Sequence, residues 1–143
     1  MKITVIGTGY VGLSLGVLLS QHNEVIAYDI DKNKIRKINS KISPFQDDII
    51  QKLLKKDNIR FKVTSNIDDA FNKTDMIIIC TPTNYDYETN QFDVSTVELT
   101  IKNIVSKKIG APVFIKSTVP VGYTEKTKVK FGLKELYFSP EFL

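Results

Sequence analysis

The sequence predicts an α/β fold with a doubly wound parallel sheet, in which helices cover both faces of six strands. Short runs rich in β-branched residues alternate along the 143-residue chain with longer segments whose apolar residues recur at helical spacing. A glycine-rich segment, GTGYVG at residues 7–12, lies between the first run and the first helical segment. Such alternation requires right-handed crossovers, and we expect the strand order 3-2-1-4-5-6. A nucleotide-binding sheet of another strand order is the alternative.

The expected elements follow from these periodicities. The fourth strand is a continuous apolar run, which suits a strand buried on both faces. A short helix is expected after Ser65, because Ser65 and Asp68 have the spacing of a capping box. Residues 81–91 are polar and are interpreted as a loop of functional length. The six strands are expected at 2–6, 24–28, 61–64, 76–80, 112–116 and 135–138, and the other helices at 10–21, 31–39, 48–56, 94–107 and 124–130.

Composition and charge favour a single globular domain. Apolar residues make up 42% of the chain and charged residues 25%, which are ordinary values for such a domain. The net charge is +4, but the basic residues are interleaved with acids, whereas nucleic-acid binding would need a concentrated basic patch. The sequence has one cysteine, no signal peptide and no apolar run long enough to span a bilayer. We therefore expect a cytoplasmic protein that binds neither nucleic acid nor membranes.

The glycine-rich segment fits the G-x-G-x-x-G pattern of dinucleotide-binding proteins. Gly7 permits the tight turn after the strand, Gly9 lets the backbone approach a pyrophosphate, and Gly12 lets the helix pack on the strand. Asp29 ends the second expected strand, where a carboxylate can accept both hydroxyls of a ribose and would repel a 2′-phosphate. The pattern therefore predicts a site for NAD rather than NADP. A structural glycine turn with a helix-capping aspartate is the simpler alternative.

Two neighbours of Asp29 carry open assignments. Asp31 could bind ribose or could instead cap the next helix. Lys34 lies one turn into that helix, where it could reach the cofactor or be an ordinary surface lysine.

Cys80 follows three isoleucines, which favours a buried structural role over a nucleophilic one. His22, the single histidine, is expected at the surface at the end of the first helix.

Small hydroxyl side chains and prolines follow each strand of the second half of the sheet. They lie in TPTN at 81–84, STVPVG at 117–122 and SPE at 139–141. Because ligands of doubly wound sheets bind beyond the carboxyl ends of the strands, we expect these groups to hold the nicotinamide half of a cofactor, a water or a substrate edge. Ordinary turn chemistry would account for any one of them alone. No cluster of residues has metal-ligand spacing.

Four segments, in order, resemble the UDP-glucose/GDP-mannose dehydrogenase family. They are VIGTGYVGLS at 5–14, TPTNYD at 81–86 followed by FD at 92–93, KSTVPVG at 116–122 and FSPEFL at 138–143. The match spans the whole chain, and its NYD segment is most similar to short bacterial UDP-glucose 6-dehydrogenases. The resemblance implies a Rossmann fold, NAD as the cofactor, and oxidation of the C6 alcohol of a nucleotide sugar such as UDP-glucose to a carboxylate in two hydride transfers.

The resemblance also implies roles for individual residues. Thr118 would contact NAD and position a catalytic water, and Glu141 would begin the segment that binds the nucleotide sugar. Together with the glycine pattern, it gives the expected cofactor residues Gly7, Gly9, Tyr10, Val11, Gly12, Asp29, Lys34, Thr83 and Thr118.

Family members are much longer, with two domains. We therefore expect residues 1–143 to form the N-terminal NAD-binding domain without the C-terminal domain that supplies the nucleophile and the base, and to be inactive alone. The family further implies a homodimer for the full-length enzyme. Two alternatives stay open: a sister enzyme acting on UDP-N-acetyl-mannosamine or GDP-mannose, and a non-enzymatic regulatory domain that senses NAD. The regulatory domain would not need the three strand-end segments.

Overall fold

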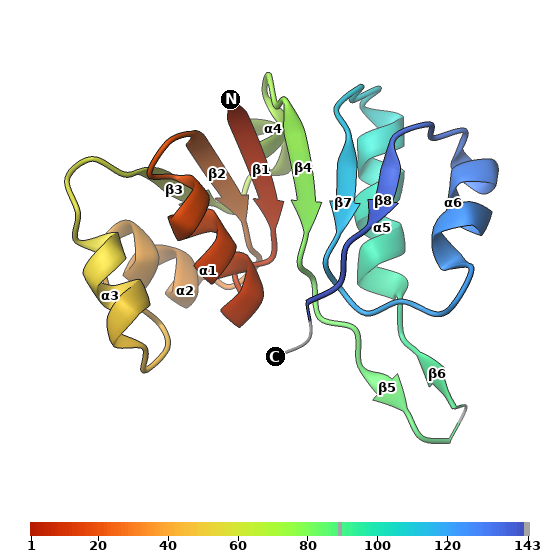
Figure 1. Cartoon of the computed structure of the whole chain (residues 1–143), viewed down its shortest axis with the longest axis horizontal. Coiled ribbons are helices and arrows are strands. Elements are labelled where there is room, and N and C mark those ends of the chain that lie inside the picture. The colour runs from red at the N-terminus through yellow and green to blue at the C-terminus, as the bar shows by residue number, and fades with distance from the viewer. Residues whose placement is uncertain (89, 142–143) are drawn as a thin grey trace.

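A parallel six-stranded sheet with helices on both faces forms the centre of the computed structural model, which describes residues 1–88 and 90–141 (Figure 1). The strand order is β3-β2-β1-β4-β7-β8, and every neighbouring pair is parallel. The doubly wound fold and the order predicted from the sequence are therefore confirmed. The strands are β1 (Lys2–Ile6), β2 (Glu24–Tyr28), β3 (Arg60–Thr64), β4 (Met76–Ile79), β7 (Val113–Ile115) and β8 (Leu136–Phe138).

The helices lie in two groups. On one face are α1 (Tyr10–Leu19), α2 (Lys32–Asn39) and α3 (Asp48–Leu54); α4 (Ile67–Phe71) and α5 (Ser95–Ser106) lie on the other, and α6 (Tyr123–Phe131) lies beyond β8. None of the helices within the described ranges is long and apolar enough to cross a bilayer.

The caps of α2 and α4 test two predictions made from the sequence. The Asp31 carboxylate accepts hydrogen bonds from the N–H groups of Asn33 and Lys34, which confirms the capping role for Asp31. The prediction of a capping box that begins at Ser65 is wrong, because Asn66 caps α4: its side chain accepts a hydrogen bond from the N–H of Asp68.

A small hairpin occupies the segment interpreted as a loop. β5 (Tyr85–Asp86) and β6 (Gln91–Phe92) pair antiparallel, and the hairpin projects below the sheet in Figure 1. The rings of Tyr85 and Phe92 meet edge-on, with their centroids 5.1 Å apart. Two-residue strands are too short to produce an alternating apolar pattern, so the periodicity of the sequence could not reveal them.

Apolar layers fill both faces of the sheet. Leu13 and Val17 of α1 pack in one layer with inward residues of β1 to β3, and Ile101 and Ile104 of α5 pack in the other with residues of β4 and β7. All four side chains are fully buried. Since neighbouring residues of a strand point to opposite faces, the continuous apolar run of β4 serves both layers.

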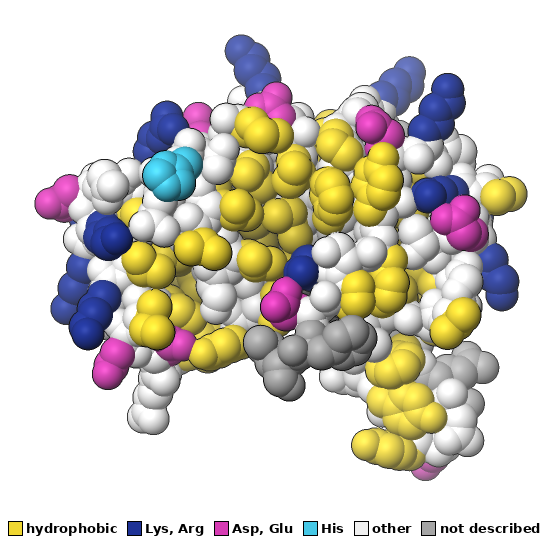
Figure 2. Space-filling view, in the orientation of Figure 1, with side chains coloured by type: hydrophobic (Ala, Val, Ile, Leu, Met, Phe, Trp, Pro, Cys, Tyr) yellow, Lys and Arg dark blue, Asp and Glu magenta, His cyan; other side chains and the backbone are white. Residues whose placement is uncertain are grey.

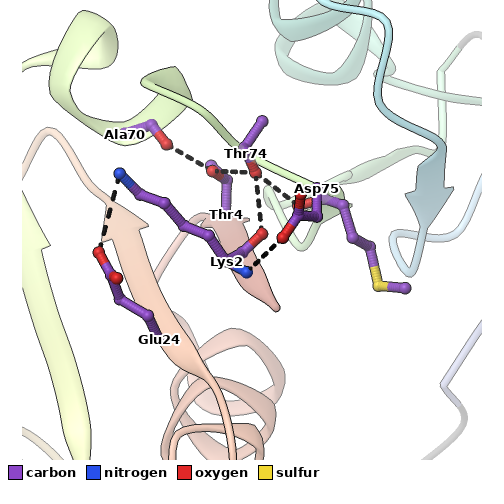
Figure 3. A network of polar contacts seen from close by, with 7 residues as sticks. Lys2, Thr4, Glu24, Ala70, Thr74 and Asp75 are labelled. Atoms are coloured by element: carbon purple, nitrogen blue, oxygen red, sulfur yellow. Dashed lines mark hydrogen bonds and ion pairs between the residues drawn. The ribbon is translucent and has the colours of Figure 1, made fainter.

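A polar network joins β1 to the segment before β4 at the amino-terminal edge of the sheet (Figure 3). The buried hydroxyl of Thr4 donates to the carbonyl of Ala70 and lies 2.9 Å from the hydroxyl of Thr74. The N–H of Lys2 donates to the Asp75 carboxylate at 2.7 Å. These contacts fasten α4 to the edge opposite the carboxyl ends of the strands, where ligands of such sheets bind.

Hydrophobic side chains gather over β4, β7 and β8 on the face opposite α5 (Figure 2). Among the described elements, no helix lies in front of these three strands in Figure 1. Phe114 and Tyr137 stack there with their centroids 5.2 Å apart, and Tyr137 is 43% exposed. This part of the sheet therefore presents apolar surface, in contrast to the part covered by α1.

Candidate cofactor-binding site

A cleft of about 750 Å³ opens at the carboxyl ends of the strands. It lies beside β1 and β4, between which the strand order reverses, and this is the position at which doubly wound sheets bind ligands. Gly12 does not line the cleft, but all the other predicted site residues do: Gly7, Gly9, Tyr10, Val11, Asp29, Lys34, Thr83, Thr118 and Glu141.

The three glycines of the loop have different surroundings. Gly7 has a φ of +94°, and a Cβ there would lie 2.7 Å from the carbonyl oxygen of Cys80. A Cβ on Gly12 would lie 2.0 Å from the carbonyl oxygen of Gly7. A Cβ on Gly9 would meet nothing within 4 Å. Gly7 and Gly12 are thus required by packing, whereas Gly9 borders open space.

The amino terminus of α1 borders the same space. Gly9 is its N-cap residue and has no side chain to bond the first-turn N–H groups, so those groups can serve a ligand. The Tyr10 ring meets Phe45 edge-on at 5.8 Å between centroids, and its hydroxyl donates to the Asp47 carboxylate. Tyr10 therefore links the cleft wall to the segment that leads into α3.

Asp29 is 8% exposed and directly follows β2. Its carboxylate accepts hydrogen bonds from the N–H of Thr8 at 2.8 Å, from the hydroxyl of Thr8, and from the N–H of Asp31 at 2.9 Å. Burial by itself would raise the pKa of Asp29, but these hydrogen bonds and the positive charge of Lys34 outweigh burial and hold the pKa below its ordinary value. Asp29 is thus ionised at neutral pH.

Hydrogen bonds also fix the loops after β4 and β7 to each other. The Ser117 hydroxyl donates to the carbonyl of Thr81 at 2.6 Å. The Thr96 hydroxyl, in the first turn of α5, donates to the carbonyl of Pro82 at 2.9 Å. As a result Thr83 and Thr118, which follow different strands, line one cleft. The third strand end contributes Glu141 alone, since Ser139 and Pro140 do not line the cleft.

An ion pair between Lys116 and Glu141 closes this end of the cleft. The Lys116 Nζ lies 2.8 Å from a Glu141 carboxylate oxygen, and the lysine side chain is only 13% exposed.

Burial raises the pKa of the neighbouring Cys80 to about 12, against the opposing effect of the Lys116 charge. A thiol that stays protonated at neutral pH agrees with the structural interpretation of Cys80.

Sequence reasoning missed several residues of the cleft. Thr8 was an unassigned position of the glycine pattern, and nothing in the sequence indicated that its hydroxyl binds Asp29. The sequence did contain a signal that one face of α5 borders the cleft. Three polar residues stand at helical spacing and line the cleft: Thr96, Thr100 and Asn103. Within residues 1–88 and 90–141, no group of three or more His, Cys, Asp or Glu is arranged to hold a metal ion.

The sheet order, the glycine loop and the acidic residue at the end of β2 together define a dinucleotide-binding Rossmann domain. The family model described as "UDP-glucose/GDP-mannose dehydrogenase family, NAD binding domain" matches residues 1–143, and the chain belongs to this family. Its cofactor is accordingly NAD.

Similar proteins include UDP-glucose 6-dehydrogenases from Campylobacter jejuni, 44% identical over the whole chain and 37% of the relative, and from Streptococcus pneumoniae, 43% identical over the whole chain and 36% of the relative. Among solved structures, a UDP-D-ManNAc dehydrogenase from Pyrococcus horikoshii covers the whole chain with a TM-score of 0.85 at 30% identity. The alignment takes in 37% of that protein. The chain thus spans little more than a third of the length of these relatives.

Proposed function

We propose that this chain is the NAD-binding domain of a UDP-glucose 6-dehydrogenase, which oxidises UDP-glucose to UDP-glucuronate with two molecules of NAD. The identity of the relatives supports UDP-glucose over a sister substrate. Relatives at 44% and 43% identity carry this name, whereas a UDP-N-acetyl-D-mannosamine dehydrogenase from Pyrococcus horikoshii is 33% identical over 88% of the chain.

The observation that carries the proposal is the cleft with open space at Gly9 and an ionised carboxylate at one end. In this arrangement Gly9 and the first turn of α1 bind the pyrophosphate, and Asp29 with Lys34 binds the adenosine ribose. Bound NAD supplies the hydride acceptor. The Asp29 charge would repel a 2′-phosphate, which accounts for a preference for NAD over NADP.

Thr83 and Thr118 lie at the opposite end of the cleft and would contact the nicotinamide half. The Thr118 hydroxyl is assigned the further task of holding the water that converts the oxidised sugar to an acid. The carboxylate of Glu141 would face the nucleotide sugar, held in place by its ion pair with Lys116.

The proposal includes a second domain that supplies the nucleophile and the base, with residues 1–143 as the N-terminal domain. Its support is the length of the relatives, of which the chain matches little more than a third. The exposed apolar face of β4, β7 and β8 agrees with this organisation, because such a face is usually covered. The homodimer expected for the full-length enzyme stays a prediction.

Calorimetric titration of the chain with NADH and with NADPH tests the cofactor site. We expect NADH to bind and NADPH to bind at least tenfold more weakly, because Asp29 is buried and charged. A chain that is folded by circular dichroism but binds NADPH as tightly as NADH would remove the role given to Asp29. The substrate is tested by comparing UDP-glucose, UDP-N-acetyl-mannosamine and GDP-mannose in the protein that includes both domains.

A further inference from the structure

Thr8 lies between the first two glycines of the loop and is completely buried. Its hydroxyl and its backbone N–H both donate to the same oxygen of Asp29, Oδ2. We propose that Thr8 is a positioning residue, which occupies Oδ2 of Asp29 and leaves Oδ1 to accept one ribose hydroxyl. The proposal rests on the NAD site described above and adds to it a residue and a binding geometry.

The number of acceptor positions on the carboxylate supports this geometry. A carboxylate has about four positions for hydrogen-bond donors, two on each oxygen. Thr8 fills both positions on Oδ2, and the N–H of Asp31 fills one on Oδ1 at 2.9 Å. One position on Oδ1 is then left for the cofactor. The sequence suggested that Asp29 accepts both ribose hydroxyls, but here the second hydroxyl must find another partner, for which Lys34 and Asp31 are the charged groups lining the same wall.

The same two hydrogen bonds keep Asp29 charged. Asp29 follows β2 in a buried position, and its N–H is itself bonded to the carbonyl of Thr64 on β3. The charged groups around it are Lys34 on α2, which favours ionisation, and Asp31 on the same turn, whose carboxylate is engaged in capping α2. Without the Thr8 hydroxyl, burial is opposed by fewer donors, and the pKa of Asp29 rises.

The test compares Thr8→Val with Thr8→Ser. Valine has nearly the shape of threonine but no hydroxyl, whereas serine retains the hydroxyl. We expect Thr8→Val to weaken NADH binding about tenfold at pH 7.5, and its affinity to fall at a higher pH than that of the original protein as Asp29 becomes protonated. We expect Thr8→Ser to follow the pH profile of the original protein. Binding is measured by NADH fluorescence, and folding by thermal unfolding.

A double-mutant cycle separates positioning from a general effect on the loop. If Thr8 acts through Asp29, the Thr8→Val penalty should largely disappear in an Asp29→Asn background. An unchanged penalty in that background, or a Thr8→Val variant with the original affinity and pH profile, would overturn the proposal. Thr8→Ala replaces Thr8→Val if valine does not fold.

Failure of the NAD site itself gives a different result. In that case the original protein would not bind NADH, and the carboxyl ¹³C titration of Asp29 would still report on Thr8. We expect this titration to move to higher pH in Thr8→Val. An unmoved titration would contradict the positioning role whether or not cofactor binds.

Discussion

The glycines of the loop should respond differently to the same added methyl group. A Cβ on Gly9 enters open space, so Gly9→Ala should leave the free energy of unfolding within about 1 kcal/mol of the original while weakening NADH binding. A Cβ on Gly12 meets the Gly7 carbonyl oxygen at 2.0 Å, so Gly12→Ala should destabilise the fold by about 2 kcal/mol or more. Urea unfolding and NADH titration of both variants measure the two effects separately.

Each glycine variant is the matched control for the other, since both add one methyl group at the start of α1: Gly9 is its N-cap and Gly12 lies in its first turn. Loss of stability in Gly9→Ala would mean that the loop is closed around Gly9. Full NADH affinity in a folded Gly9→Val protein would show that the loop is a structural turn and not a phosphate cradle.

Asp29 should also make stability depend on pH. Its pKa lies below the ordinary value of 3.8 in the folded protein, so its contribution is complete above pH 3.8. That contribution is lost as the pH falls through the lowered pKa of the folded state. Asp29→Asn should therefore cost about 1–2 kcal/mol at pH 7, and the difference from the original protein should shrink as the pH falls below the ordinary pKa of 3.8. Urea unfolding at several pH values measures it; a difference that does not vary with pH would contradict the assignment.

At the scale of elements, the ends of α6 depend on glycines in the left-handed conformation. Gly132 has a φ of +66° and follows the last residue of the helix. An alanine there retains the strained backbone, so Gly132→Ala should destabilise the protein by about 1–2 kcal/mol. Gly110 is the control: no positive φ is found there, and a Cβ would meet nothing within 4 Å. Equal melting temperatures for the two variants would show that α6 does not need this cap.

The sequence allowed the strands to be located because five of the six are runs rich in β-branched residues and β8 is a short run of leucine and aromatic residues. Their order followed from the crossover rule and the position of the glycine loop. Helix ends were less accurate: α1 was expected to reach residue 21 but ends at Leu19, because the polar residues Ser20 and Gln21 carry no apolar spacing that marks where the helix stops. The hairpin β5–β6 was missed because cross-strand contacts of aromatic rings, such as Tyr85 with Phe92, leave no local pattern.

The site could be predicted where a motif fixes the backbone and not where side chains from distant segments meet. Asp29 was found from its place after β2. Its bonding to Thr8, 21 positions earlier in the chain, depends on how the loop folds back over β2. In the same way, Lys116 and Glu141 become partners because β7 and β8 are neighbours in the sheet.

At the scale of the whole molecule, the proposal that one domain binds NAD and a second supplies the nucleophile and the base predicts that this chain binds NAD without oxidising the sugar. The chain should bind NAD but form no NADH with UDP-glucose. Cys80, its single thiol, has a pKa raised to about 12 by burial and so lacks the thiolate that a nucleophile needs. Absorbance at 340 nm with UDP-glucose and excess NAD is the measurement. Steady turnover that Cys80→Ser abolishes would overturn both the structural role of Cys80 and the need for a second domain.

The glycine loop also contacts the residue that follows β4, at position 80. The backbone of Cys80 touches the space beside Gly7, and its Cβ lies 3.1 Å from where a Cβ on Gly12 would be. The backbone at the end of β4 therefore fills the space that a side chain at position 7 would need, and any residue at position 80 has that backbone. In a library randomised at positions 7 and 80 and selected for folded protein, only glycine should survive at position 7, while position 80, which lines the cleft, should accept several residues. The constraint between these two distant segments thus acts on the loop and not on the strand end.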